Sequence, residues 1–154
     1  MNIIKKINQF NIDNVYFCDP IKNNIMNDSL FIRILYSNNL FMLNGIYLLI
    51  TFQNLNIEKY YNKYRCNFDV TLHKELIEQI KMIEEHILCK NKMKEKIPIF
   101  KIFEHVKNGN IKIFSDNIET INNQFLLKIS GMWETDTNYG LTYKFINIVS
   151  EIKL

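Results

Sequence analysis

Near the C-terminus, aromatic rings and lysines alternate in two β-rich runs. The only tryptophan, Trp133, closes the first run, and tyrosines and a further lysine follow in the turn and in the second run. Rings interleaved with cations on a hairpin form a surface where unpaired bases stack and ammonium groups hold phosphates. Our first candidate nucleic-acid-binding set is therefore Trp133, Tyr139, Tyr143, Lys144 and Lys128.

A purely structural interpretation of this set stays open. By the two-residue period of a strand, Leu141, Tyr143 and Phe145 share one face, so the Tyr143 ring is equally compatible with a core position. Trp133 can also be a core residue, and the lysines would then be ordinary solvated side chains.

A second candidate set lies in the middle of the chain. Three tyrosines and three cations fall within seven residues, and an arginine can stack on a ring as well as pair with a phosphate. The set is Lys59, Tyr60, Tyr61, Lys63, Tyr64 and Arg65. The alternative is a half-exposed edge strand whose tyrosines cover the core. The connector lysines at 90, 92, 94, 96 and 101 either hold phosphates or form a solvated loop.

Catalytic and metal-binding patterns are not found in the sequence. His86 and Cys89 are one helical turn apart, but no second pair at ligand spacing accompanies them. Glu134 and Asp136 are typical turn residues, and no glycine-rich phosphate loop occurs. We expect no enzyme activity, no metal and no cofactor.

Composition limits the class of protein. The chain has 154 residues, a net charge of +3 and a pI near 8.7, which is mildly basic for a duplex-DNA binder but compatible with a local basic groove. Three cysteines in no CxxC spacing, and no signal peptide, predict an intracellular, reducing location. The longest apolar stretch, 45–52, is too short to cross a bilayer, so we expect no membrane association.

One helix is predicted with particular clarity. Apolar residues recur every three or four positions over 71–89, with charged residues on the opposite face. Thr71 is the expected N-cap. A second short helix is predicted over 99–106, ended by Asn108 and Gly109.

Strands are predicted on both sides of these helices, over 15–18, 31–36, 46–52, 60–70 and 111–114. Either 37–39 or 44–45 could close a hairpin onto 46–52, and 115–123 reads as loop. The closing hairpin turns near 135–139, and Gly131 indicates a bulge or a close approach.

This order predicts a single, mainly β domain over 1–154: an oligonucleotide-binding-fold-like antiparallel barrel with one long helix. The alternative is an α+β open antiparallel sheet with a packed helix.

Several segments resemble the single-stranded-DNA-binding proteins of large double-stranded DNA viruses of eukaryotes. They are Asn44–Phe52, Ile83–Leu88, Asn108–Phe114, Leu127–Trp133 and Gly140–Phe145. The sharpest part is the Gly-x-Trp that ends Leu127–Trp133, followed after a short turn by Gly-Leu-Thr-Tyr-Lys-Phe. The resemblance extends over about residues 30–148. It implies an oligonucleotide-binding fold, a role in replication or recombination, and the host cytoplasm or nucleus as location.

The expected function is non-catalytic, sequence-tolerant binding of single-stranded DNA, and RNA is the alternative ligand. The expected partners are that strand and, further, a second copy of the chain or a replication protein. The alternative function is a protein–protein interaction module or accessory subunit on the same fold.

Overall fold

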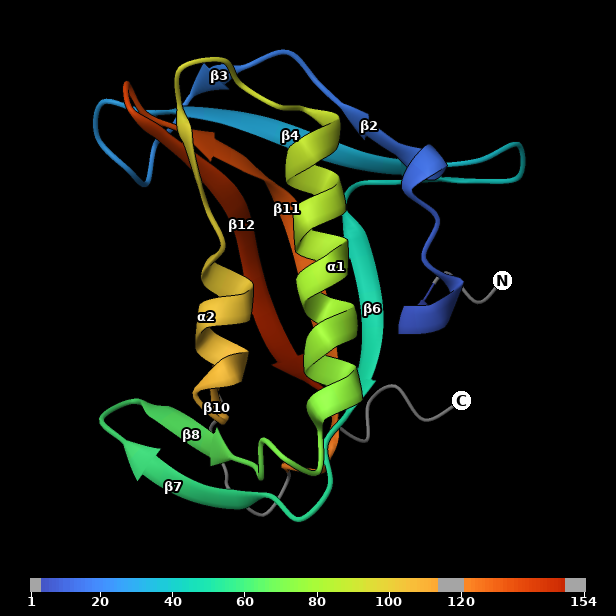
Figure 1. Cartoon of the computed structure of the whole chain (residues 1–154), viewed down its shortest axis with the longest axis vertical. Coiled ribbons are helices and arrows are strands. Elements are labelled where there is room, and N and C mark those ends of the chain that lie inside the picture. Colours follow the sequence, from blue (N-terminus) through green and yellow to red (C-terminus); the bar gives the residue numbers. More distant parts are fainter. Residues whose placement is uncertain (1–3, 114–120, 149–154) are drawn as a thin grey trace.

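The computed structural model describes residues 4–113 and 121–148, which are mainly β-structure with two α-helices (Figure 1). The larger sheet contains β1 (Lys5–Lys6), β2 (Val15–Phe17), β3 (Ile21–Lys22), β4 (Leu30–Ser37), β5 (Met42–Leu43), β6 (Ile46–Thr51), β9 (Ile97–Ile99), β11 (Gln124–Glu134) and β12 (Asn138–Asn147). The smaller sheet has the order β10 (Asn110–Ile113), β8 (Lys63–Asn67), β7 (Asn56–Tyr60).

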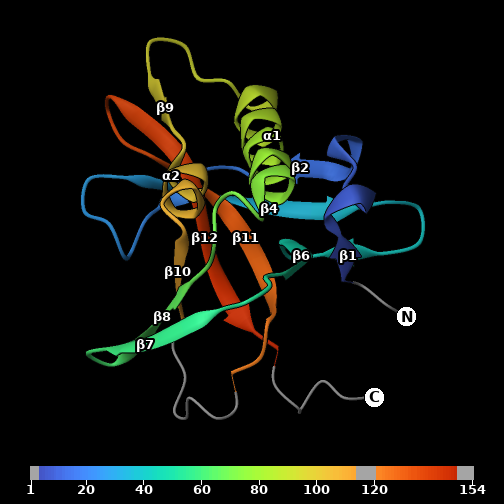
Figure 2. The ribbon, with the colours of Figure 1, turned by 60° about the horizontal axis from the view of Figure 1, so that its bottom comes forward.

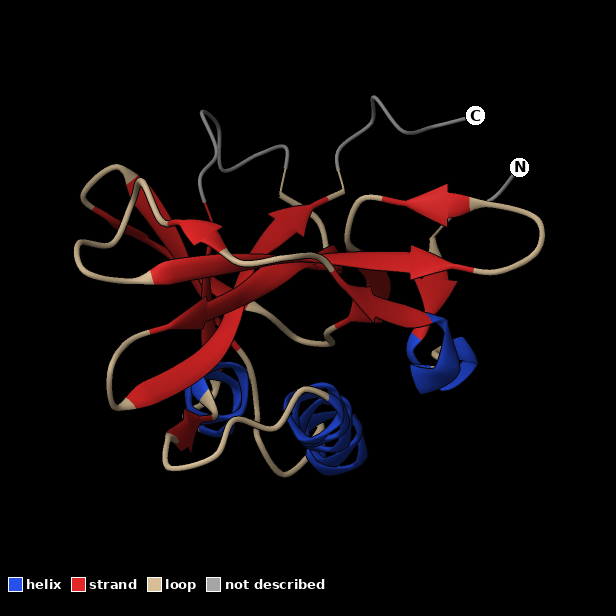
Figure 3. Cartoon of the chain, turned by 90° about the horizontal axis from the view of Figure 1, so that it is seen from above, coloured by secondary structure: helices blue, strands red, loops and turns tan. Residues whose placement is uncertain are grey.

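The larger sheet is mixed. Its main path is β1-β6-β11-β12-β9, and β4 pairs with the far end of β11. The β1–β6 and β12–β9 pairs are parallel and the others are antiparallel. Among the described residues the strand ladders do not close into a barrel. Instead, α1 (Lys74–Lys90) and α2 (Lys101–Lys107) lie side by side on one face of the sheet (Figure 3).

Burial follows the strand period. On β4, Ile32, Ile34 and Tyr36 are buried, and on β6 the buried residues are Ile46, Leu48 and Ile50. Together with the apolar face of α1 they form one core that also includes residues of the smaller sheet. The period-2 and period-3.6 patterns of the sequence therefore place the core correctly.

The two predicted helices are confirmed, with shifted starts. Asp69 Oδ1 accepts hydrogen bonds from the backbone N–H groups of Thr71 and Leu72, so this segment is a turn and α1 begins only at Lys74. The expected Thr71 cap is therefore wrong, and His73 occupies the N-cap. The short helix ends as predicted, with Gly109 at φ +81° donating to the Val106 carbonyl.

Two strand predictions need correction. The segment 60–70 is not one strand: Asn56–Tyr60 and Lys63–Asn67 form a hairpin whose turn lies at Tyr61–Asn62. Neither predicted turn closes a hairpin onto 46–52, because β4 turns back onto the short β5 and β6 pairs with β11. Phe114 and residues 115–120 of the predicted loop lie outside the described residues.

The closing hairpin and its bulge are confirmed. The register between β11 and β12 shifts between Ile129 and Gly131, which leaves Ser130 as the extra residue. Before the bulge, Leu127 and Ile129 face the helices. After it, Met132 takes that side. The bulge therefore moves Trp133 onto the opposite face of the sheet, because a one-residue slip exchanges the two faces of a strand.

Candidate functional site

A pocket of about 560 Å³ lies where β12 becomes an edge strand, beyond its last pair with β9 at Gly140. Side chains from β11, β12, β4, α2 and the loop after β3 surround it. We call it the Trp133 pocket. Its lining is Ile21, Lys22, Asn23, Asn24, Ile25, Met26, Phe31, Arg33, Lys101, His105, Ser130, Trp133, Leu141, Thr142 and Tyr143.

Two aromatic rings form the floor of this pocket, and each lies over a glycine. A Cβ on Gly140 would come within 2.7 Å of the Trp133 indole, and a Cβ on Gly131 within 2.5 Å of the Phe31 ring. Trp133 and Phe31 are direct cross-strand partners. The two glycines therefore allow both rings to lie flat on the sheet, where side chains at these positions would lift them away.

Cations lie beside both rings. Lys101 Nζ is 5.3 Å from the centroid of the Trp133 ring, and Arg33 Cζ is 5.9 Å from that of Phe31. Arg33 also donates a hydrogen bond of 2.8 Å to Asn44 Oδ1, which fixes the direction of its guanidinium. These contacts place positive charge at the rim of an aromatic floor.

A second pocket, of about 300 Å³, adjoins the first, because His105 and Tyr143 line both. We call it the Lys112 pocket and the two together the groove. Its lining is Lys63, His105, Asn110, Ile111, Lys112, Tyr143, Lys144 and Phe145. The groove thus follows the edge of β12 toward the smaller sheet.

The charge of the groove has one sign. Each pocket contributes three lysines or arginines, and no Asp or Glu lines either pocket among the described residues. His105, at their junction, has a lowered pKa because burial, and then the nearby Lys112 and Lys101, disfavour its protonated form, while Glu104 acts in the opposite direction. The groove is therefore electropositive even though the net charge of the chain is only +3.

Tyr143 lines both pockets. Its hydroxyl hydrogen-bonds with His105 Nδ1, which ties β12 to α2. Burial raises the pKa of Tyr143, and the carboxylates of Glu84 and Glu104 add to the effect. The phenol is therefore a neutral hydrogen-bonding group.

A buried carboxyl positions α2 along the groove. The Glu84 side chain, on α1, is fully buried and accepts hydrogen bonds from the backbone N–H groups of Ile102 (3.0 Å) and Phe103 (2.9 Å). Burial raises its pKa to about 7, although these two hydrogen bonds act to lower it. Glu84 thus satisfies the open N–H groups at the start of α2, the helix that carries Lys101 and His105.

The structure brings part of the predicted residues together. Trp133, Tyr143, Lys144 and Lys63 line the groove, and Lys128 is the cross-strand partner of Lys144. Trp133 is only 8% exposed, so its indole is a packed floor and not a free platform.

Two of the tyrosines predicted to bind nucleic acid are not on the surface. Tyr139 is 3% exposed and Tyr64 8% exposed, and both belong to the core, because they occupy inward positions of β12 and β8. Lys59 is exposed on β7 opposite Tyr64. Tyr60, Tyr61 and Arg65 lie at and beside the β7–β8 turn.

The connector lysines do not form one continuous phosphate-binding surface. Lys90 Nζ donates to the Ile12 carbonyl and Lys96 pairs with Glu134 at 2.6 Å, whereas Lys101 belongs to α2 and lines the groove. Phe31, Arg33 and Lys112 were missed, since the sequence shows them only as strand residues. The one available signal was Gly131 beside Trp133, which indicates a close approach without identifying the neighbour.

The described residues contain no candidate metal-binding cluster, no disulfide and no membrane-spanning helix. In that part, no group of three or more His, Cys, Asp or Glu side chains is arranged to hold a metal ion, and Cys18, Cys66 and Cys89 are free. None of its helices is long and apolar enough to cross a membrane.

Comparison with family models, with curated proteins and with solved structures finds no match for this chain. The resemblance to viral single-stranded-DNA-binding proteins therefore stays a prediction.

Proposed function

We propose that this chain binds single-stranded nucleic acid in the groove, without catalysis and without strong sequence preference. The observation that carries the proposal is the composition of the groove: six lysines or arginines, an aromatic floor and no carboxylate in its described lining. Proteins that bind single strands without sequence preference usually combine two features. Cations contact the phosphates of the nucleic-acid backbone, and aromatic rings stack with the bases.

A single strand suits this surface better than a duplex. The half-buried Phe31 and the largely buried Trp133 line the bottom of a pocket that can receive an unpaired base but not a base stacked inside a duplex. Cations line the Trp133 pocket and continue to Lys144 on β12 and Lys112 on β10, where phosphates of the same strand would follow.

The proposal includes two predictions that come from the resemblance. One is a role in DNA replication or recombination, and the other is a relation to the oligonucleotide-binding fold. In favour of the second, the sheet is strongly curved and leaves one face free of helices (Figures 2 and 3).

The test is a titration of labelled oligo-dT, oligo-U and a duplex of equal length, each at low and at raised salt. We expect the unpaired strands to bind more tightly than the duplex, with affinity falling steeply as salt rises because bound counterions are released. Lys144→Ala should reduce the salt slope by about one, as for one lost phosphate contact. Lys74→Ala removes the same charge from α1, outside the groove, and should leave the slope unchanged.

Duplex binding that equals or exceeds single-strand binding would contradict the proposal. Absence of binding at low salt would favour the alternative, an interaction module that serves as an accessory subunit.

A further inference from the structure

The turn between β7 and β8 carries an aromatic residue in an unfavourable backbone conformation. Tyr60 pairs with Lys63, so only Tyr61 and Asn62 form the connection. Tyr61 has φ +56°, a left-handed conformation that glycine, asparagine and aspartate adopt much more readily. The residue is 83% exposed. A strained, exposed tyrosine at a hairpin tip is poorly explained by folding alone and points to a role in binding.

The neighbouring ring is held in place by cations. The Tyr60 centroid lies 4.8 Å from Arg65 Cζ and 5.4 Å from Lys112 Nζ. Tyr61 meets Tyr60 edge to face at 4.9 Å. The Tyr60 ring is thus ordered by its contacts and provides a base for the exposed Tyr61 ring.

This tip continues the groove. Lys112 lines the Lys112 pocket and also contacts the Tyr60 ring, and Lys63, the first residue after the turn, lines the same pocket. The β7–β8 turn and the loop after β3, which borders the Trp133 pocket, lie on the same side of the molecule (Figures 1 and 2). A carboxylate lies beside this tip: Glu58 Oε1, on β7, is 3.9 Å from Arg65 Nη1. The charge of Arg65 is therefore paired, and the tip offers rings rather than a free cation from Arg65.

We propose that Tyr61, supported by Tyr60, is a second base-stacking station, and that the ligand is an extended strand reaching from the Trp133 pocket to this tip. The inference rests on the proposed function and deepens it by setting a minimum ligand length. Between Gly140 and Phe145 alone, β12 extends about 17 Å, at about 3.4 Å per residue. A mononucleotide or dinucleotide therefore reaches one station only.

The test is a length series of labelled oligo-dT from about two to about sixteen nucleotides, which covers the site sizes of about 4–16 nucleotides that single-strand binding modules have. Tyr61→Asn removes the ring and keeps a residue that tolerates the left-handed backbone, so the turn should still form. Tyr61→Phe keeps the ring and is the matched control.

We expect Tyr61→Asn to weaken binding of the longest oligomers by about 5- to 150-fold, the loss of one stacked base. Binding of the shortest oligomers should not change, and Tyr61→Phe should behave as the parent chain. If the parent chain binds all lengths and Tyr61→Asn binds them equally well, the second station is refuted while the proposed function stands. If the parent chain binds no length at low salt, the proposed function itself fails.

Discussion

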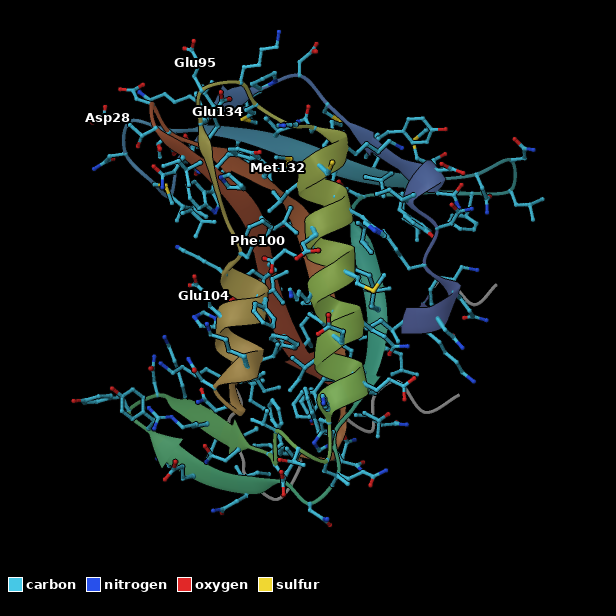
Figure 4. The ribbon with its side chains drawn as sticks, viewed as in Figure 1. Asp28, Glu95, Phe100, Glu104, Met132 and Glu134 are labelled. Carbon is cyan, nitrogen blue, oxygen red and sulfur yellow. The ribbon has the colours of Figure 1, made fainter. Side chains whose placement is uncertain are left out.

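Two hollows at the same end of the sheet share Lys22 but differ in their chemistry. The Trp133 pocket has an aromatic floor and cations without a carboxylate in its described lining. The other hollow, of about 470 Å³, is lined by Lys22, Asp28, Ser29, Leu30, Lys96, Glu134, Thr135 and Asp136. We call it the Glu134 hollow. Figure 4 shows Asp28 and Glu134 near the tip of the β11–β12 hairpin.

The comparison shows that the two hollows differ in how much of the positive charge of their lysines is already paired with carboxylates. In the Glu134 hollow, Lys96 Nζ is 2.6 Å from Glu134 Oε1, and two further carboxylates are present. A phosphate there would meet more negative than positive charge. In the groove, Lys101 and Lys112 contact the rings of Trp133 and Tyr60, and both lower the pKa of His105. Their positive charge therefore acts on the groove itself.

The largest effect is expected where an aromatic ring is part of the fold. Trp133→Ala should destabilise the chain by about 3–5 kcal/mol, because the buried indole over Gly140 leaves a cavity. Urea unfolding measures the loss. Tyr16→Ala is the control, since Tyr16 is 53% exposed and removal of its ring should change stability by only about 0.5 kcal/mol. Equal stability of the two variants would show that Trp133 is not a packed floor.

A second effect concerns the carboxyl that supports the groove from inside. The folded pKa of Glu84, about 7, lies above its ordinary 4.5, so the folded chain holds this proton more tightly than the unfolded chain. The contribution to stability is therefore greatest below pH 4.5 and is lost as pH rises to about 7. The change corresponds to about 3 kcal/mol.

In the parent chain the Ile102 and Phe103 N–H groups donate to different oxygens of Glu84. Glu84→Gln keeps only one of these two acceptors, so it should be less stable at every pH, but its side chain cannot ionise. The variant's free energy of unfolding, measured by urea titration at several pH values, should fall less than that of the parent chain between pH 4.5 and 7. Parallel pH profiles for the two chains would mean that Glu84 keeps its ordinary pKa.

The sequence predicts elements better than it predicts the site. The α1 pattern and the β11–β12 hairpin are visible because hydrophobic period depends on neighbours along the chain. The Phe31–Trp133 floor depends on pairing between strands about 100 residues apart and on a one-residue bulge at Ser130. Likewise, Lys96 and Lys101 look alike in the sequence, and only the fold pairs one with Glu134 and exposes the other to the groove.

The comparison of the two hollows can be tested most directly with a pair of lysine variants. Lys112→Ala and Lys96→Ala each remove one positive charge, so any effect of net charge is the same in both. We expect Lys112→Ala to lower the slope of log affinity for oligo-dT against log salt by about one, and Lys96→Ala to leave it unchanged. Lys112→Ala should also raise the His105 pKa, measured by NMR titration, because a nearby cation is lost. Equal changes of slope in both variants would mean that binding follows total charge and that the groove has no special role. A lower slope without a change at His105 would mean that Lys112 reaches the phosphate from a position away from the junction of the two pockets.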